Sequence, residues 1–178
     1  MIVRSLFVES KKLRVFDFDD SLVTTTSYVY VTNEKSGRKF KLTPGEYAVY
    51  TPKAGDTFDY SDFQKVQNPK IIKGYFEILR RMAAKADGDR RVYILTARSA
   101  YRPVHKFIKD SGIANVYVVA LGDANPEKKA DWIEDKVRDE NYDDVFFVDD
   151  SLKNIDAVRQ RLSKYPNVTK KIQHIKHS

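Results

Sequence analysis

Residues 13–21 read Leu-Arg-Val-Phe-Asp-Phe-Asp-Asp-Ser, an apolar run that ends abruptly in acidic residues. β-branched and aromatic side chains in a short, nearly unbroken run are typical of a strand that is buried on both faces of a sheet. Side chains two positions apart in a strand point to the same side, so Asp17 and Asp19 share a side and Phe18 points away from them. We therefore expect a core strand with two carboxylates at its carboxyl end.

Apolar helices and strands alternate along the chain from about residue 70. Apolar residues between Ile71 and Met82 recur at helical spacing and predict a helix that stops around Asp87. Strands that alternate with helices predict a parallel sheet with helices on both faces, which is an α/β fold of the Rossmann-like type. The length of 178 residues predicts a single domain over residues 1–178. The further predicted helices are 101–111, 126–141 and 152–164, and the predicted strands are 91–96, 116–121, 144–148 and 168–175.

The segment between the first strand and this regular part, residues 22–70, has a different pattern. A β-hairpin is predicted by the alternating stretches 28–32 and 39–42. Thr43-Pro44 predicts the start of a helix, and the Pro, Gly, Asp and Ser content of 51–68 predicts mostly loop. We expect a small insertion that contains a hairpin.

Composition excludes several kinds of site. The absence of cysteine excludes disulfides and thiolate chemistry, and three histidines, two of them near the end of the chain, argue against an all-histidine zinc site. A metal would therefore have oxygen ligands, which favours Mg²⁺, Mn²⁺ or Ca²⁺. No apolar stretch approaches the ~20 residues of a membrane span, and the apolar run within residues 1–12 is too short and too charged for a signal peptide. We expect a cytoplasmic protein without a membrane partner.

The net charge is +7 and the isoelectric point is about 9.4. This charge fits a lysine-rich solvated surface, and it equally fits an anionic partner such as a phosphate ester, a nucleotide or a nucleic acid. Charge alone leaves both interpretations open, and the sequence leaves the oligomeric state open as well.

Polar side chains follow the predicted core strands at the point where each strand ends. Ligands of open parallel sheets bind at this edge. Several carboxylates close together repel one another, and a divalent cation with oxygen ligands removes that cost. Each piece alone is weak, because an Asp-x-Asp pair is more often a capped loop, but their combination at one edge predicts a metal site. The residues are, in chain order, Asp17, Asp19 and Asp20; Thr96 and Arg98; Gly122 and Asp123; Asp149 and Asp150.

This combination resembles the four motifs of the haloacid dehalogenase superfamily, whose members are mostly phosphatases with an aspartate nucleophile. The run from Asp17 to Ser21 resembles the first motif, Thr96 the second, and Asp149-Asp150 the fourth. Lys128 and Lys129 are both candidates for the lysine of the third motif, and the spacing to the following apolar residue favours Lys129. The resemblance covers about residues 13–165 outside the insertion.

Two positions depart from the superfamily's usual pattern. Ser21 stands where Thr is commoner, which keeps the hydroxyl group. Asn154 stands where Asp is often found, so a carboxylate that supports the metal is missing there, and Asp149 is expected to compensate for it.

The resemblance implies a role for each residue. The catalytic residues would be Asp17 as nucleophile, Asp19 as acid and base, and Thr96 and Lys129 as contacts to the phosphoryl group. Asp19 would need a pKa suited to both roles, which a neighbouring carboxylate can supply. Arg98 is either a contact to substrate phosphate or one half of a surface ion pair. The implied Mg²⁺ ligands are Asp17, Asp19 (through its main-chain carbonyl), Asp149 and Asp150, and the implied substrate-binding residues are Thr96, Ala97, Arg98 and Lys128.

In this superfamily an insertion after the first motif forms a cap, which here would be small and span residues 22–70. The chain is also similar to the phosphatase half of polynucleotide repair enzymes, which with the basic charge favours a nucleotide or nucleic-acid end as substrate. Sugar phosphates and other small metabolites are the alternative. Aromatic and basic side chains of the insertion would either stack bases or form the packing face of the hairpin, and we favour packing. These side chains are Tyr28, Tyr30, Lys39, Phe40, Lys41, Tyr47 and Tyr50.

Two functions of other classes compete with a phosphatase. A receiver-type phosphoacceptor domain also groups acidic residues, a Thr and a Lys around Mg²⁺, but its acceptor Asp ends the third strand, where this chain has Leu121-Gly122-Asp123. A catalytically silent binding module on the same fold is the other alternative. The presence of a candidate for every chemical role argues against it.

Overall fold

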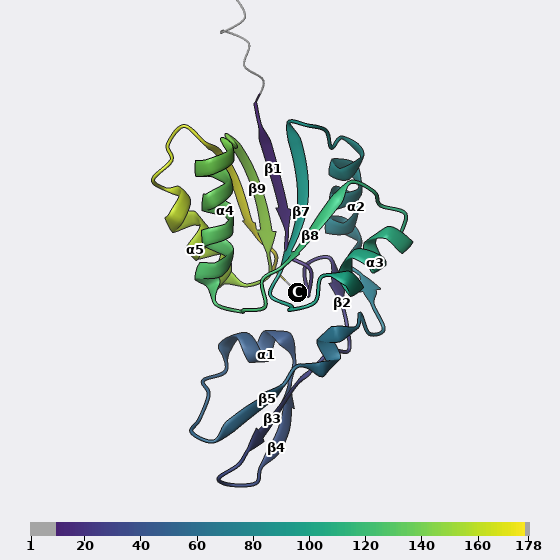
Figure 1. Cartoon of the computed structure of the whole chain (residues 1–178), viewed down its shortest axis with the longest axis vertical. Helices are drawn as coiled ribbons and strands as arrows, with labels where there is room; N and C mark the ends of the chain where they lie inside the picture. Colours follow the sequence, from purple (N-terminus) through teal and green to yellow (C-terminus); the bar gives the residue numbers. More distant parts are fainter. Residues whose placement is uncertain (1–9, 177–178) are drawn as a thin grey trace, which may run out of the picture.

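The computed structural model describes residues 10–176, and its centre is a five-stranded sheet with helices on both faces (Figure 1). The five strands are parallel and lie in the order β10-β9-β1-β7-β8. The predicted α/β fold of the Rossmann-like type is confirmed. The bounds of the strands are β1 (Lys12–Phe16), β7 (Arg90–Thr96), β8 (Val116–Ala120), β9 (Asp144–Asp149) and β10 (Thr169–His174).

The order of the strands places β1, and with it the acidic residues 17–20 that follow β1, at the middle of the sheet. β1 pairs with β7 on one side and β9 on the other, and Phe16 lies opposite Ile94 and Val148. Counted along the chain, the core strands lie in the order 3-2-1-4-5. Receiver-type domains have the order 2-1-3-4-5. The topology therefore argues against the receiver-type alternative.

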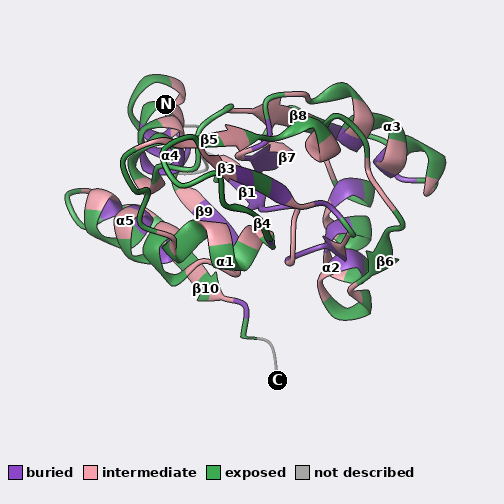
Figure 2. Ribbon diagram, turned by 90° about the horizontal axis from the view of Figure 1, so that it is seen from below, coloured by how far each residue is buried: buried purple, intermediate pink, exposed green. Residues whose placement is uncertain are grey.

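Two pairs of helices cover the sheet. α2 (Lys73–Ala84) and α3 (Arg102–Asp110) pack on one face, and α4 (Pro126–Glu140) and α5 (Leu152–Leu162) pack on the other (Figure 1). Neighbouring strand residues point to opposite faces, so Phe16 packs with the first pair and Val15 with the second. Figure 2 shows buried residues on the central strands and exposed residues on the outer sides of the helices. Burial on both faces explains the apolar runs of the strands.

The insertion is connected to the core by two antiparallel segments. β2 (Val23–Thr24) pairs with β6 (Lys70–Ile71), so the outgoing and returning chains lie side by side. This pairing corrects the predicted start of the next helix. The helical spacing of apolar residues includes Ile71, but α2 begins at Lys73, because Ile71 pairs with Val23.

The body of the insertion is a three-stranded antiparallel sheet with one helix. β3 (Val29–Asn33) and β4 (Lys39–Leu42) form the predicted hairpin, and α1 (Pro44–Val49) begins at the predicted cap Thr43. The prediction of mostly loop over 51–68 holds for the greater part of this segment but misses two short elements. β5 (Asp56–Asp59) pairs with β3, and a short 3-10 helix, η2 (Ser61–Gln64), follows it. β5 has a single large apolar residue, so its strand character depends on pairing that the local sequence does not indicate.

The aromatic residues of the insertion divide between two faces of its sheet. Phe40, Tyr47 and Tyr50 pack around the buried residues of β3 and β4, as the packing hypothesis predicts. Tyr28 and Tyr30 alternate with these buried residues and belong to the other face, where the Lys41 Nζ lies 4.1 Å from the centre of the Tyr28 ring. The packing interpretation therefore holds for one face only.

No helix within residues 10–176 is long and apolar enough to cross a membrane. The prediction that the N-terminal residues are not a signal peptide concerns residues 1–12, of which 1–9 lie outside the described part of the chain.

Candidate active site

Three carboxylates meet at the carboxyl edge of the sheet. The backbone N–H of Asp17 donates to the Val148 carbonyl at 3.0 Å, which continues the pairing of β1 with β9 and places Asp17 beside the end of β9. Carboxylate oxygens of Asp17, Asp149 and Asp150 lie within 4.8 Å of one another. Thr96 is buried at the end of the neighbouring strand β7. The predicted convergence of Asp17, Thr96 and the Asp149-Asp150 pair on one edge is present.

Lys129 connects two of these carboxylates. Its Nζ donates to Asp17 Oδ1 at 2.8 Å and to Asp149 Oδ2 at 2.7 Å, and the residue is only 3% exposed. Burial alone lowers the pKa of the Lys129 ammonium group, but the two carboxylates outweigh burial and hold the pKa above its ordinary value. The side chain lies here because α4 begins at this edge, with Asn125 as its N-cap and Pro126 as its first residue.

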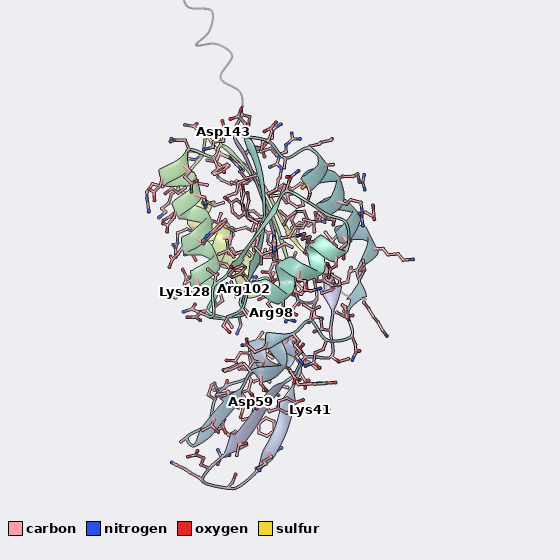
Figure 3. The ribbon with its side chains drawn as sticks, turned by 45° about the vertical axis from the view of Figure 1, so that its right-hand side comes forward. Lys41, Asp59, Arg98, Arg102, Lys128 and Asp143 are labelled. Carbon is pink, nitrogen blue, oxygen red and sulfur yellow. The ribbon has the colours of Figure 1, made fainter. Side chains whose placement is uncertain are left out.

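Lys128, the other candidate lysine, is exposed. Neighbouring residues of an α-helix are rotated by about 100° from each other, and here Lys129 lies on the buried side of α4 whereas Lys128 lies on the exposed side. Figure 3 shows Lys128 at the start of α4, on the edge of the core that faces the insertion. The structure therefore selects Lys129 as the lysine beside Asp17 and leaves Lys128 at the rim.

Ser21 holds the second oxygen of Asp17. Its hydroxyl donates to Asp17 Oδ2 at 2.7 Å and accepts from the backbone N–H of Asp150 at 3.2 Å. A tight turn makes this contact possible, because Asp20 adopts a left-handed conformation with φ of 59° and the chain folds back after Phe18. The sequence identified Ser21 as a motif position, but its link to the Asp149-Asp150 segment was not predicted.

Asp149 is fully buried and has a donor for each oxygen. Oδ1 accepts from the Ser151 N–H at 2.8 Å, and Oδ2 accepts from the Asn154 amide at 2.9 Å as well as from Lys129. Asn154 reaches this position because Ser151 caps α5 and accepts from the Asn154 N–H. Asn154 therefore supports Asp149 by donating a hydrogen bond from its amide group. An ionised carboxylate at this position has no hydrogen to donate.

The cluster holds more acidic than basic groups. If all three carboxyl groups were ionised, the single ammonium group of Lys129 would leave two negative charges uncompensated among Asp17, Asp149 and Asp150. Burial, followed by repulsion from Asp17 and Asp149, raises the pKa of Asp150 to about 9. Burial and the charge of Asp17 likewise raise the pKa of Asp149. Such a set of oxygen ligands could hold a metal ion, and a divalent cation would balance the charge.

Arg98 lies beside Asp19 and is buried, which corrects the surface ion pair considered from the sequence. Its Nε and Nη2 donate to the two carboxylate oxygens of Asp19 at 2.9 and 2.8 Å, and the residue is 4% exposed. The expected neighbour of Asp19 was a carboxylate, but the structure places this guanidinium there. Asp19 is not one of the three clustered carboxylates.

Two further residues near this edge differ in their relation to the cluster. His174, at the end of β10, has its Nε2 2.9 Å from the Asp150 carbonyl, and no sequence motif indicated it. Asp123, which follows β8, is exposed and accepts from the Asn125 N–H in a local turn, so it does not join the cluster.

Comparisons with protein-family models, with curated proteins and with solved structures find no match to this chain. The site is therefore interpreted from its own geometry: a parallel α/β sheet whose central edge carries three carboxylates, a buried lysine and a threonine.

Proposed function

We propose that this chain is a magnesium-dependent phosphatase of the haloacid dehalogenase superfamily, which hydrolyses a phosphate monoester through a phosphoaspartyl intermediate on Asp17. The observation that carries the proposal is the contact of buried Lys129 with both Asp17 and Asp149, beside Asp150. Burial of the Lys129 ammonium group between Asp17 and Asp149 costs desolvation free energy. Neutralisation of charge on a phosphoryl group would explain why a lysine is buried there despite this cost. The insertion serves as the cap.

The residues present fit a magnesium ion. Asp17 and Asp150 would be direct ligands together with the main-chain carbonyl of Asp19. Asp149 would support these ligands without binding the ion directly, because its oxygens already accept three hydrogen bonds. Magnesium usually keeps several waters, so two or three protein oxygens suffice. When bound, Mg²⁺ neutralises charge on the nucleophile and on the phosphoryl oxygens.

The reaction divides into two displacements at phosphorus. In the first, a carboxylate oxygen of Asp17 bonds to phosphorus and the bond to the ester oxygen breaks. Asp19, which has to enter this step with one oxygen protonated, gives that proton to the ester oxygen. In the second, water gives a proton to Asp19 and bonds to phosphorus, and the bond to Asp17 breaks to release inorganic phosphate. Thr96 and Lys129 donate hydrogen bonds to phosphoryl oxygens, and Ser21 keeps Asp17 oriented.

A nucleotide or nucleic-acid end is the substrate that the charges at the edge support. Exposed Lys128 and Arg102 lie at the rim that faces the insertion (Figure 3). Tyr101, 48% exposed beside Arg102, could stack on a base, and the net charge of +7 favours polyanions. A sugar phosphate would use none of these side chains beyond the site itself.

Hydrolysis of p-nitrophenyl phosphate with Mg²⁺ and with EDTA tests the activity. Asp17→Asn should abolish turnover, whereas Asp123→Asn, a matched change at an exposed strand-end aspartate, should leave it unchanged. Full activity of Asp17→Asn would refute the mechanism, and no turnover by the unaltered chain would favour a silent binding module. A panel of nucleotides, sugar phosphates and 3′- or 5′-phosphorylated oligonucleotides then tests the substrate, and a clear preference for sugar phosphates would refute a nucleic-acid end.

A further inference from the structure

Arg98 joins the core to the insertion through a buried guanidinium group. Besides its two bonds to Asp19, its Nη1 donates to the main-chain carbonyls of Phe63 at 3.2 Å and Lys65 at 2.8 Å. The guanidinium carbon lies 5.4 Å from the centre of the Phe18 ring and 5.1 Å from that of Phe63. The side chain is 1% exposed. From a position two residues after the end of β7, this side chain thus contacts both the turn after β1 and the returning segment of the insertion.

The contacts continue from this segment into the inserted sheet. Asp62, in η2 next to Phe63, accepts from the Tyr28 N–H and the Tyr30 hydroxyl, both at 3.0 Å. Hydrogen bonds and the main chain of η2 therefore connect β3 to Asp19. Tyr30 of β3 donates to Asp62, the adjacent Phe63 accepts from Arg98, and Arg98 donates to Asp19. Displacement of the insertion would pull on the residue proposed for proton transfer.

The geometry of the guanidinium makes this connection specific. Arginine presents five N–H groups in a planar fork, and here the fork binds a carboxylate on one side and two carbonyls on the other. Lysine cannot reproduce this, because its ammonium is a single point charge. Because its N–H groups already donate to Asp19, Phe63 and Lys65, the guanidinium is not directed at substrate phosphate. Its role therefore differs from the phosphate contact that was considered from the sequence.

We infer that Arg98 is a positioning residue that couples the placement of the insertion to the orientation of Asp19. The inference rests on the proposed function for its effect on turnover, but the coupling itself does not require that function. When Phe63 and Lys65 lie against Arg98, both Asp19 oxygens are held towards the fork and the carboxylate has one orientation. When they move away, Arg98 loses two acceptors and an aromatic face, and the orientation of Asp19 is no longer fixed.

The kinetic test compares Arg98→Lys and Arg98→Gln with Arg80→Lys, a matched change at an exposed arginine paired with Glu77. Both Arg98 variants should lower kcat on p-nitrophenyl phosphate about tenfold to hundredfold, with KM changed by less than about threefold, because orientation rather than binding is lost. Arg80→Lys should behave as the unaltered chain does. Rescue by lysine, or an unchanged kcat in Arg98→Gln, would overturn the inference.

Asp62→Ala extends the test, since Asp62 makes no direct hydrogen bond to Asp19 or Arg98 among the described contacts but ties η2 to β3. It should also lower kcat more than it changes KM. An unchanged kcat in this variant would contradict the coupling.

The reciprocal test needs no activity. Coupling acts in both directions, so Asp19→Ala should raise backbone hydrogen exchange of residues 62–66 about tenfold or more, and Asp123→Ala should not. Exchange in Asp19→Ala that equals that of the unaltered chain would overturn the coupling. If the chain has no phosphatase activity but Asp19→Ala accelerates exchange, the proposed function fails and the coupling stands.

Discussion

The Nζ of Lys129 lies 2.8 Å from Oδ1 of Asp17, and both side chains are almost completely buried. Because Asp149 also accepts from this ammonium group, its removal would leave two buried carboxylates without their cation. Lys129→Met should therefore lower the free energy of unfolding by about 3–5 kcal/mol. Lys128→Met, the same change one residue earlier on the exposed side, should alter it by about 0.5 kcal/mol or less. Urea denaturation of both variants measures the difference, and equal effects would contradict the assignment of Lys129.

The hydroxyl of Ser21 joins Asp17 to the backbone of Asp150, and Ser21 is fully buried. Ser21→Ala removes one donor and one acceptor without adding bulk, so it should destabilise the protein by about 1–3 kcal/mol. It should also reduce turnover, because one oxygen of the proposed nucleophile loses its partner. The control is Ser99→Ala at an exposed position, for which we expect no change in urea midpoint. A Ser21→Ala protein as stable as the control would argue against this bridge.

The end positions of parallel strands explain which parts of the site were predictable. Asp17 directly follows β1, and Thr96 and Asp149 are the last residues of β7 and β9. Parallel strands bring their carboxyl ends to one edge of the sheet whatever the loops do. To choose between Lys128 and Lys129, one has to know which side of α4 faces the core, and the motif alone does not give this. Sequence position therefore predicts residues fixed by the sheet better than residues fixed by a helix.

The contacts of Arg98 could not have been predicted. Its carboxylate partner, Asp19, lies 79 residues earlier, and its other acceptors are main-chain carbonyls, which every residue has. The same limitation explains β5, where pairing of Asp56–Asp59 with β3 makes a strand from residues with little apolar pattern. Local sequence indicates neither kind of long-range contact.

Asn154 offers a test of the departure from the superfamily's usual aspartate. Its amide donates to Asp149 Oδ2 at 2.9 Å, so Asn154→Asp replaces a donor by a further negative charge beside a buried carboxylate. In EDTA we expect a loss of about 1–3 kcal/mol of unfolding free energy. Mg²⁺ should stabilise this variant more than the unaltered chain, because the added charge favours a cation. Thermal unfolding with and without Mg²⁺ measures both effects, and a smaller response to Mg²⁺ in the variant would contradict the prediction.

The raised pKa of Asp150 predicts an unusual dependence of stability on pH. Burial and the charges of Asp17 and Asp149 raise this pKa to about 9, whereas an aspartate in the unfolded chain has a pKa of about 3.9. Between these values the folded carboxyl binds a proton that the unfolded one has lost, so this group makes stability fall as pH rises. A metal ion favours the ionised form and opposes that fall.

Melting temperatures in EDTA and in Mg²⁺ from pH 5 to pH 8 measure this dependence. The melting temperature in EDTA should fall across this range, the stabilisation by Mg²⁺ should grow with pH, and Asp150→Asn should weaken both trends because it has no proton to lose. Asp123→Asn is the control, since Asp123 is exposed and outside the cluster. Equal Mg²⁺ stabilisation at pH 5 and pH 8 in the unaltered chain would show that Asp150 does not lose a proton on metal binding, and the assignment of Asp150 as a ligand would then fail.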